Sequence, residues 1–230
     1  TAHEVFLKLE SVKAELTETK DRPSGHLRIT TTVGFGAGWL TYRVQEFLEL
    51  YPDIQVQLML SDEELDLNMR EADCAIRLRQ PQQPDLIQRK LFTVHLHVYA
   101  APEYLNRFGR PESLNDLERH RIVTFGEPAP NYLHDLNSLL TLERDGKDPL
   151  VPTLEINTIM SVRRAVQSGV GVALLPDYAV ERSSGLVRIL EDVALPSFDT
   201  YFAYAETMRN AAKLRAFRDF LFAKARSWEY

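Results

Sequence analysis

A run of hydroxyl side chains followed by glycines is the part of this sequence best suited to bind a ligand. Thr31 and Thr32 precede Gly34 in the run TTVGFGAGW. The glycines from Gly34 to Gly38 predict a tight turn. A helix that starts after such a turn presents unpaired backbone N–H groups and its positive dipole end, which suit an anion. The hydroxyls add donors for a carboxylate or phosphate. The pattern predicts an anion site at Thr31, Thr32, Val33 and Gly34. The alternative is that a threonine only caps the helix.

The same run partly matches a dinucleotide-binding motif. It supplies the first two glycines of the G-x-G-x-x-G pattern, but Trp39 stands where the third glycine belongs. That glycine allows close packing of helix on strand, and an indole cannot replace it. The sequence therefore disfavours nucleotide binding, and we expect no cofactor.

Further candidates stand where predicted strands end. Ser61 follows the strand IQVQLML, and Arg77 follows DCAI. Ligands of open α/β sheets gather at the carboxyl ends of strands, and a guanidinium can hold a carboxylate through two hydrogen bonds. The alternative for Arg77 is a solvated surface position.

A second set of candidates lies later in the chain. Asn157 and Thr158 start a predicted helix and could present polar groups to a ligand or simply cap that helix. Phe125 and Pro176 would supply apolar walls to the same site, or else belong to the core.

Other reactive side chains do not form recognisable sites. His95 and His97 share one face of a predicted strand, but two imidazoles make a poor zinc site without a third ligand. Cys74 is the only cysteine and is predicted to be a buried structural thiol. The sequence has no G-x-S-x-G, H-E-x-x-H or G-x-x-x-x-G-K-[ST] motif, so we expect no enzyme and no metal.

The composition is that of an ordinary globular protein. The chain has 230 residues, is 44% hydrophobic and carries a formal net charge of −6. This length suits one large domain or two lobes, and an acidic chain does not favour direct nucleic-acid binding. We expect a cytoplasmic protein because a single cysteine fits a reducing compartment and no apolar run could span a bilayer.

The elements that must position these residues alternate along the chain. Apolar periodicity predicts a β-α-β-α-β start, hence a parallel sheet with helices on its faces. A hairpin or pair of edge strands is predicted around Asp145 and Gly146. Strands are predicted at 26–32, 54–60, 73–78, 94–100, 121–125, 171–176, 186–192 and 200–206, and helices at 40–51, 62–71, after Pro102, at 158–168 and at the C-terminal end.

The first residues differ from the rest. Val5, Leu9, Val12 and Leu16 follow a 4-3-4 spacing, which is typical of a helix paired in a coiled coil. We interpret residues 1–24 as the end of a linker helix; the alternative is a helix packed on its own domain.

Several segments together resemble the LysR-type transcription regulators. They follow the amphipathic start of the chain in the family's order, and they are GHLRITTTVGFGAGWL, FLELYPDIQVQLMLSD, ADCAIRL, VYAAPEYL and VQSGVGVALLPDY. Each is weak alone, but in register they cover essentially the whole chain from Gly25 onward.

The resemblance implies an effector-binding domain with a fold like a type II periplasmic binding protein. It implies an α/β protein of two lobes, each with a central mixed sheet flanked by helices. Residues 25–100 with 203–230 would form lobe I, and 101–202 would form lobe II. A small effector would lie in the cleft between the lobes.

The resemblance also implies partners for the chain. Dimers or tetramers are expected, with operator DNA contacted only through a winged helix-turn-helix before Thr1. We expect the effector to be a carboxylate or another small anion, and we expect no membrane association. The alternative function is a stand-alone solute-binding protein of the same fold.

Overall fold

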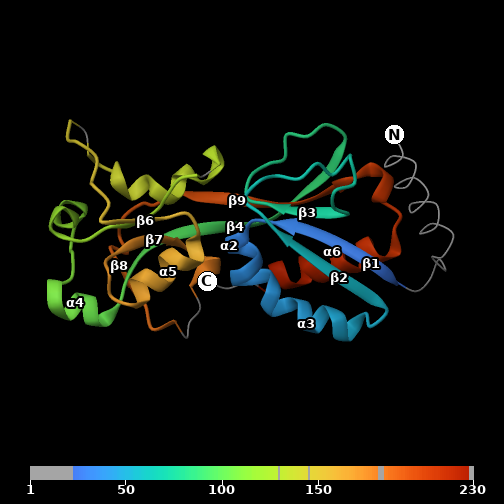
Figure 1. Cartoon of the computed structure of the whole chain (residues 1–230), viewed down its shortest axis with the longest axis horizontal. Coiled ribbons are helices and arrows are strands. Elements are labelled where there is room, and N and C mark those ends of the chain that lie inside the picture. Colours follow the sequence, from blue (N-terminus) through green and yellow to red (C-terminus); the bar gives the residue numbers. More distant parts are fainter. Residues whose placement is uncertain (1–22, 129, 145, 181–183, 228–230) are drawn as a thin grey trace. The chain divides into compact units, whose positions relative to one another are not determined.

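The computed structural model describes residues 23–128, 130–144, 146–180 and 184–227 (Figure 1). They form a mixed α/β fold, as predicted. The described residues divide into two compact units: unit 1 contains 23–32, 40–92 and 199–227, and unit 2 contains 33–39 and 93–198. The predicted linker helix lies outside the described residues except for its last two positions. The lobe boundaries drawn from the sequence stay a prediction.

The sheet of unit 1 begins with parallel strands. Strand β1 (Gly25–Thr31) pairs in parallel with β2 (Ile54–Leu60) and with β3 (Cys74–Arg77), and β3 pairs antiparallel with β9 (Ser197–Ala205). The register sets Thr31 beside Leu60, and Thr30 beside Ala75. The carboxyl ends of these parallel strands therefore meet at one edge of the sheet.

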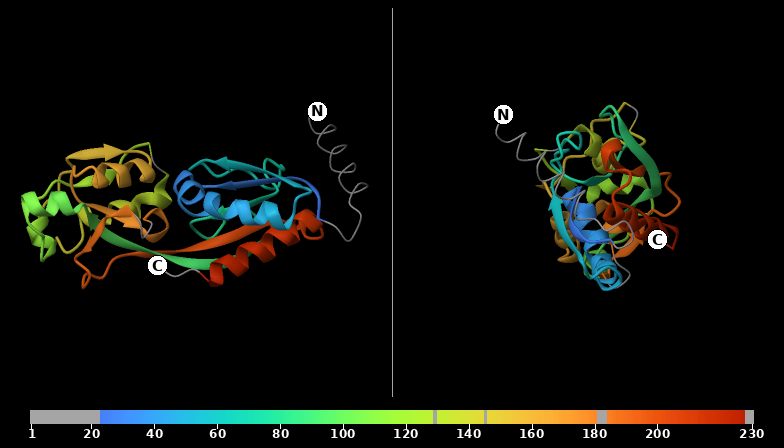
Figure 2. Two further views of the ribbon diagram at one scale, coloured as in Figure 1. Left: turned by 90° about the horizontal axis from the view of Figure 1, so that it is seen from below. Right: turned by 90° about the vertical axis from the view of Figure 1, so that its right-hand side faces the viewer.

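Two helices pack together in unit 1. Helices α3 (Thr41–Leu50) and α6 (Ala212–Arg226) lie side by side in Figures 1 and 2, and the ring of Phe47 is 5.3 Å from that of Phe217. The spacing of four residues predicts the apolar face of this C-terminal helix, and all four are buried on α6, which confirms the helix: Leu214, Phe217, Leu221 and Ala225. The spacing of Leu40, Val44, Phe47 and Leu48 predicts that all four lie on the inner face of the helix expected at 40–51, but Leu48 on α3 is 37% exposed. A short 3-10 helix, η6 (Glu206–Met208), precedes α6.

The helix predicted at 62–71 is wrong, because this segment is a loop held by its own carboxylates. The Asp66 carboxylate accepts the N–H groups of Asn68 and Met69 at 2.8 and 3.3 Å, and the Glu71 carboxylate accepts the N–H of Asp66 at 2.6 Å. Side-chain acceptors thus replace the carbonyl oxygens that a helix would use.

Unit 2 is built around the second half of β4 (Leu86–Ala100), which lies beside β9 (Figure 2). Strands β7 (Ala173–Pro176) and β8 (Val187–Ile189) pair antiparallel with β4. Strand β5 (Val123–Phe125) pairs in parallel with β6 (Leu154–Ile156), and Ile122 bridges to Val172 in parallel just before β7. The carboxyl ends of β5, β6 and β7 therefore point the same way. The helical elements are α2 (Val33–Phe35), η1 (Gly36–Leu40), α4 (Pro102–Phe108), η2 (Leu114–Arg119), η3 (Asn131–Leu140), α5 (Ile159–Gln167) and η4 (Asp177–Ala179).

Helix α5 forms where its periodicity predicts. Thr158 caps it, Ile159, Val162 and Val166 are buried, and Gly169 follows it with a left-handed φ of 76°. This φ favours glycine, which has no Cβ to clash.

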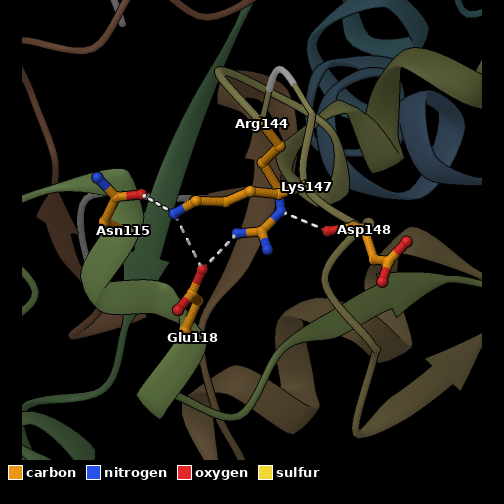
Figure 3. Close-up of polar contacts among 5 residues, drawn as sticks. All are labelled: Asn115, Glu118, Arg144, Lys147 and Asp148. Carbon is orange, nitrogen blue, oxygen red and sulfur yellow. Dashed lines mark hydrogen bonds and ion pairs between the residues drawn. The ribbon is translucent and has the colours of Figure 1, made fainter.

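The hairpin predicted around Asp145 is wrong. Strand β6 begins only at Leu154 and pairs with β5, not with a preceding strand. Charged side chains hold the segment instead, as Figure 3 shows: Arg144 and Lys147 both bind the Glu118 carboxylate, at 3.2 and 3.4 Å. Lys147 also donates to Asn115 on η2. These bonds fix this part of the chain to η2.

The glycine-rich turn predicted at 34–38 is also wrong, because these residues are helical. The glycines are needed for close packing. A Cβ on Gly34 would lie 2.3 Å from Cγ2 of Ile159, and one on Gly38 would lie 2.6 Å from the carbonyl oxygen of Tyr178. Neither glycine has a positive φ.

Candidate functional site

The first candidate group lies at the end of β1 in unit 1. Thr31 is the last residue of the strand and is 0% exposed. Its carbonyl oxygen accepts the N–H of Ser61 at 3.0 Å, but its hydroxyl makes no hydrogen bond with any described residue. Leaving a buried hydroxyl unpaired is unfavourable. Thr32 is buried just after the strand, and Val33 is half-buried at the start of α2.

Ser61 follows β2, and Arg77 ends β3. Both therefore lie at the same edge of the sheet as Thr31. Both support the loop that precedes β3. The Ser61 hydroxyl accepts the N–H of Glu63 at 3.1 Å, and Arg77 donates from Nη2 to the carbonyl oxygen of Leu65 at 2.7 Å. Arg77 is only 5% exposed, so the surface position considered for it is wrong. The guanidinium has five donors and can bind more than one acceptor.

The second candidate group lies at the ends of β5 and β6 in unit 2. Phe125 ends β5 and is 5% exposed. The side-chain amide of Asn137 accepts the N–H of Phe125 at 3.0 Å and donates to its carbonyl oxygen at 2.6 Å. Phe125 pairs with Ile156, so Asn157 follows at the same edge, where it is exposed.

Thr158 connects this edge to α5. Its hydroxyl accepts the N–H of Ser161 at 3.4 Å, so Thr158 acts as the helix cap. The next residue, Ile159, lies against Gly34. Gly34, which was predicted as a ligand contact, is therefore packed on the first turn of α5.

Pro176 ends β7 and leads into η4. The following residue, Asp177, has a side chain that is 3% exposed, and its carboxylate accepts the N–H groups of His95 and Tyr178 at 3.0 and 2.7 Å. Burial raises the pKa of Asp177 to about 6, although both N–H groups and the nearby His95 ring oppose the shift.

The predicted site residues thus form two groups, each at the carboxyl edge of strands in its own unit. Unit 1 contains Thr31, Thr32, Ser61 and Arg77, and unit 2 contains Val33, Gly34, Phe125, Asn157, Thr158 and Pro176. Whether they bind an effector stays a prediction.

Sequence reasoning missed Asn137, Ile159 and Asp177. A carboxylate directly after the buried run GVALLP was a signal for Asp177. The bonds of Asn137 to Phe125 had no local signal.

Among the described residues, no group of three His, Cys, Asp or Glu side chains is arranged to hold a metal ion. Cys74 is buried, and burial raises the pKa of its thiol well above the ordinary value. The thiol therefore stays protonated, which makes it a weak nucleophile. No described helix is long and apolar enough to cross a membrane.

Comparison with known proteins gives a consistent assignment. Residues 20–226 match the LysR substrate binding domain family. An HTH-type transcriptional regulator of Xanthomonas campestris pv. campestris is 31% identical over 93% of this chain, and the chain spans 63% of that relative, less than two thirds of its length. The HTH-type transcriptional activator TtdR of Escherichia coli O6:K15:H31 is 29% identical over 96% of this chain and 72% of its own length.

Solved structures agree with the sequence matches. The regulatory domain of CrgA, a LysR-type transcriptional regulator from Neisseria meningitidis, superimposes with a TM-score of 0.77 and 26% identity, covering 88% of this chain and 100% of that domain. The chain belongs to the LysR substrate-binding domain family and is the effector-binding domain of a LysR-type transcription regulator, with the periplasmic-binding-protein-like fold. Its named relatives are regulators and not transport proteins or enzymes, which favours the first of the two functions predicted.

Proposed function

We propose that this domain senses a small organic anion bound in the cleft between its two lobes and passes the signal to a DNA-binding module elsewhere in a cytoplasmic regulator. The observation that carries the choice of an anion is the buried Thr31 hydroxyl at the carboxyl end of β1, which has no partner among the described residues. An effector oxygen would give it one. Arg77 at the neighbouring strand end would contribute positive charge.

Unit 2 would shape the effector site and would supply fewer hydrogen-bond donors than unit 1. Phe125 and Pro176 are buried apolar residues at strand ends, and Asn157 is an exposed amide next to them in the register. Ligand sites of this kind combine an apolar lining with a few polar groups that fix orientation.

Signalling would follow from a difference in affinity. An effector changes the equilibrium between two conformations of the domain. The change is at most the ratio of its affinities for the two conformations. Through an assembly of such domains, this shift would change how the DNA-binding modules are held.

Self-association would use the exposed apolar side chains of unit 1. Tyr42 and Leu50 on α3 are 62% and 59% exposed, and Leu60 ends the edge strand β2. Exposed apolar side chains beside an open strand edge are typical of an interface. Sedimentation of wild type and Leu50→Lys tests this: the variant should dissociate at concentrations where wild type is a dimer or tetramer. A wild type that is monomeric throughout would refute it.

A thermal-shift screen tests effector binding. The panel comprises carboxylates, amino acids, aromatic acids and sugar phosphates. A ligand at about 100 times its dissociation constant adds roughly 2.7 kcal/mol, or roughly 5–10 °C for a domain of this size. The shift should be lost in Thr31→Val and kept in Thr207→Val, an exposed threonine of the same unit. A flat screen with folded protein would contradict the anion site.

A further inference from the structure

The carboxylate of Asp177 connects two elements of unit 2. The last paired residues of β4 and β7 are Leu96 and Pro176, and Asp177 comes next. Its Oδ2 accepts the N–H of His95 at 3.0 Å, so the side chain extends the β4–β7 ladder by one hydrogen bond. Its Oδ1 accepts the N–H of Tyr178 at 2.7 Å. The carboxylate therefore fixes the start of η4 against β4.

Tyr178 packs against the segment Val33–Trp39, so the position of η4 affects the position of this segment. The Tyr178 ring meets the ring of Phe35 edge-on at 5.4 Å, and its carbonyl oxygen occupies the space beside Gly38. Phe35 in turn stacks on Trp39 at 5.1 Å. Because Tyr178 is 3% exposed and Trp39 is 0% exposed, a movement of η4 must disturb the packing of the whole segment.

We infer that Asp177 is a proton-linked positioning residue, which holds η4 and, through Tyr178, the Val33–Trp39 segment in the buried arrangement seen here. This goes beyond effector binding, because it is a response to pH that needs no ligand. The segment follows Thr31 and Thr32 directly in the chain, so its release would also alter the proposed effector site.

Titratable and charged groups near Asp177 come from β4, β8 and α5. Strand β4 presents His95, with Nδ1 at 3.7 Å, and then His97 and Tyr99 on the same face. Strand β8 presents Arg188 beside Tyr99, and Arg163 of α5 donates to the carbonyl oxygen of Ala179 in η4. No Lys or Arg among the described residues forms an ion pair with Asp177.

Two of the neighbouring groups do not titrate between pH 5 and 8. Burial, with the charges of Arg188 and His95, lowers the pKa of His97 to about 4. Burial raises the pKa of Tyr99 above its ordinary value of 10.0. His95 lies directly beside Asp177, so the experiment includes a variant of each residue.

The direction of the pH effect follows from burial. The buried arrangement raises the pKa of Asp177 from 3.8 to about 6, so this arrangement binds the proton more tightly than an opened one. The stabilisation is complete below about pH 4 and is lost as pH rises through 6. Over that range the ratio of opened to buried forms rises on the order of 100-fold.

Trp39 itself reports the change. The chain has two tryptophans, and Trp228→Phe leaves Trp39 as the only one. In that background, acrylamide quenching of Trp39 should rise at least about twofold from pH 5 to pH 8, because the rising pH favours opening. The rise should be absent in Asp177→Asn, which cannot ionise, and present in Asp192→Asn, an exposed carboxylate of the same unit.

His95→Gln tests the assignment of the transition to Asp177. Because His95 lowers the pKa of Asp177, its removal should move the quenching midpoint to higher pH. A transition that persists in Asp177→Asn or disappears in His95→Gln would overturn the proposal, and so would a flat wild type. If Asp177→Asn does not fold, a ¹³C titration of the wild-type Asp177 carboxyl decides: a midpoint near the quenching midpoint supports the proposal, and one near the ordinary value overturns it.

Discussion

Thr31 and Thr158 stand at the ends of strands in different units, and only one of them has its hydroxyl engaged. Thr158 caps α5 through the N–H of Ser161, whereas the Thr31 hydroxyl is buried with no partner among the described residues. Threonine thus caps a helix at position 158, whereas at position 31 its buried hydroxyl lacks a hydrogen-bond partner among the described residues. Under the proposed function, unit 1 would supply donors to the effector and unit 2 would supply a fixed surface.

The largest effect should come from the glycines that fix the unit 2 surface. Gly38→Ala would place a methyl group 2.6 Å from the backbone oxygen of Tyr178, which cannot move aside as a side chain can. Chemical denaturation should show a loss of about 3 kcal/mol in the free energy of unfolding.

Gly34→Ala provides the matched control. Its added methyl group would clash with the Ile159 side chain at 2.3 Å and meet the Tyr178 side chain at an ordinary 3.5 Å, so the double variant with Ile159→Ala should lose less than the sum of the single losses. Additive losses would mean that the segment and α5 are not packed as described.

The next largest effect concerns Asn137. Asn137→Ala leaves the N–H and carbonyl oxygen of Phe125 without their partner, and the free energy of unfolding should fall by about 2 kcal/mol. Asn115→Ala, which loses only an exposed bond to Lys147, should stay near wild type in the same denaturation experiment. Equal stabilities of the two variants would show that Phe125 is held in another way.

The smallest effect concerns the helix cap. Thr158→Val removes the acceptor for the N–H of Ser161 and should cost about 1 kcal/mol of unfolding free energy. Thr158→Ser keeps the hydroxyl and should remain close to wild type in parallel melts. A loss of the same size in the serine variant would assign the effect to packing of the methyl group.

The strands could be predicted from the sequence more reliably than the segments between them. Runs such as IQVQLML and GVALLP end where β2 and β7 end, and this placed Ser61 and Pro176 at strand ends. Glycine was ambiguous at 34–38, because it serves tight turns and close packing equally well. The contact that decides, Gly34 against Ile159, joins residues far apart in the chain.

The sequence predicted which types of residue lie at the candidate site, but it did not predict which of their hydroxyl groups have a hydrogen-bond partner. Both threonines were selected as polar groups near helix starts, yet only the structure distinguishes the hydroxyl that caps from the one without a partner. The loop at 62–71 was misassigned for a related reason: its carboxylates bind backbone N–H groups locally, which a helical pattern of apolar residues does not reveal.

The most direct test of the account is a calorimetric titration of wild type, Thr31→Val and Thr158→Val with the anion that gives the largest thermal shift. Thr31→Val should bind about tenfold more weakly and be as stable as wild type or more so, because valine removes an unpaired buried hydroxyl. Thr158→Val should lose stability but keep its affinity. Wild-type affinity in Thr31→Val would contradict the central claim that the end of β1 binds the effector.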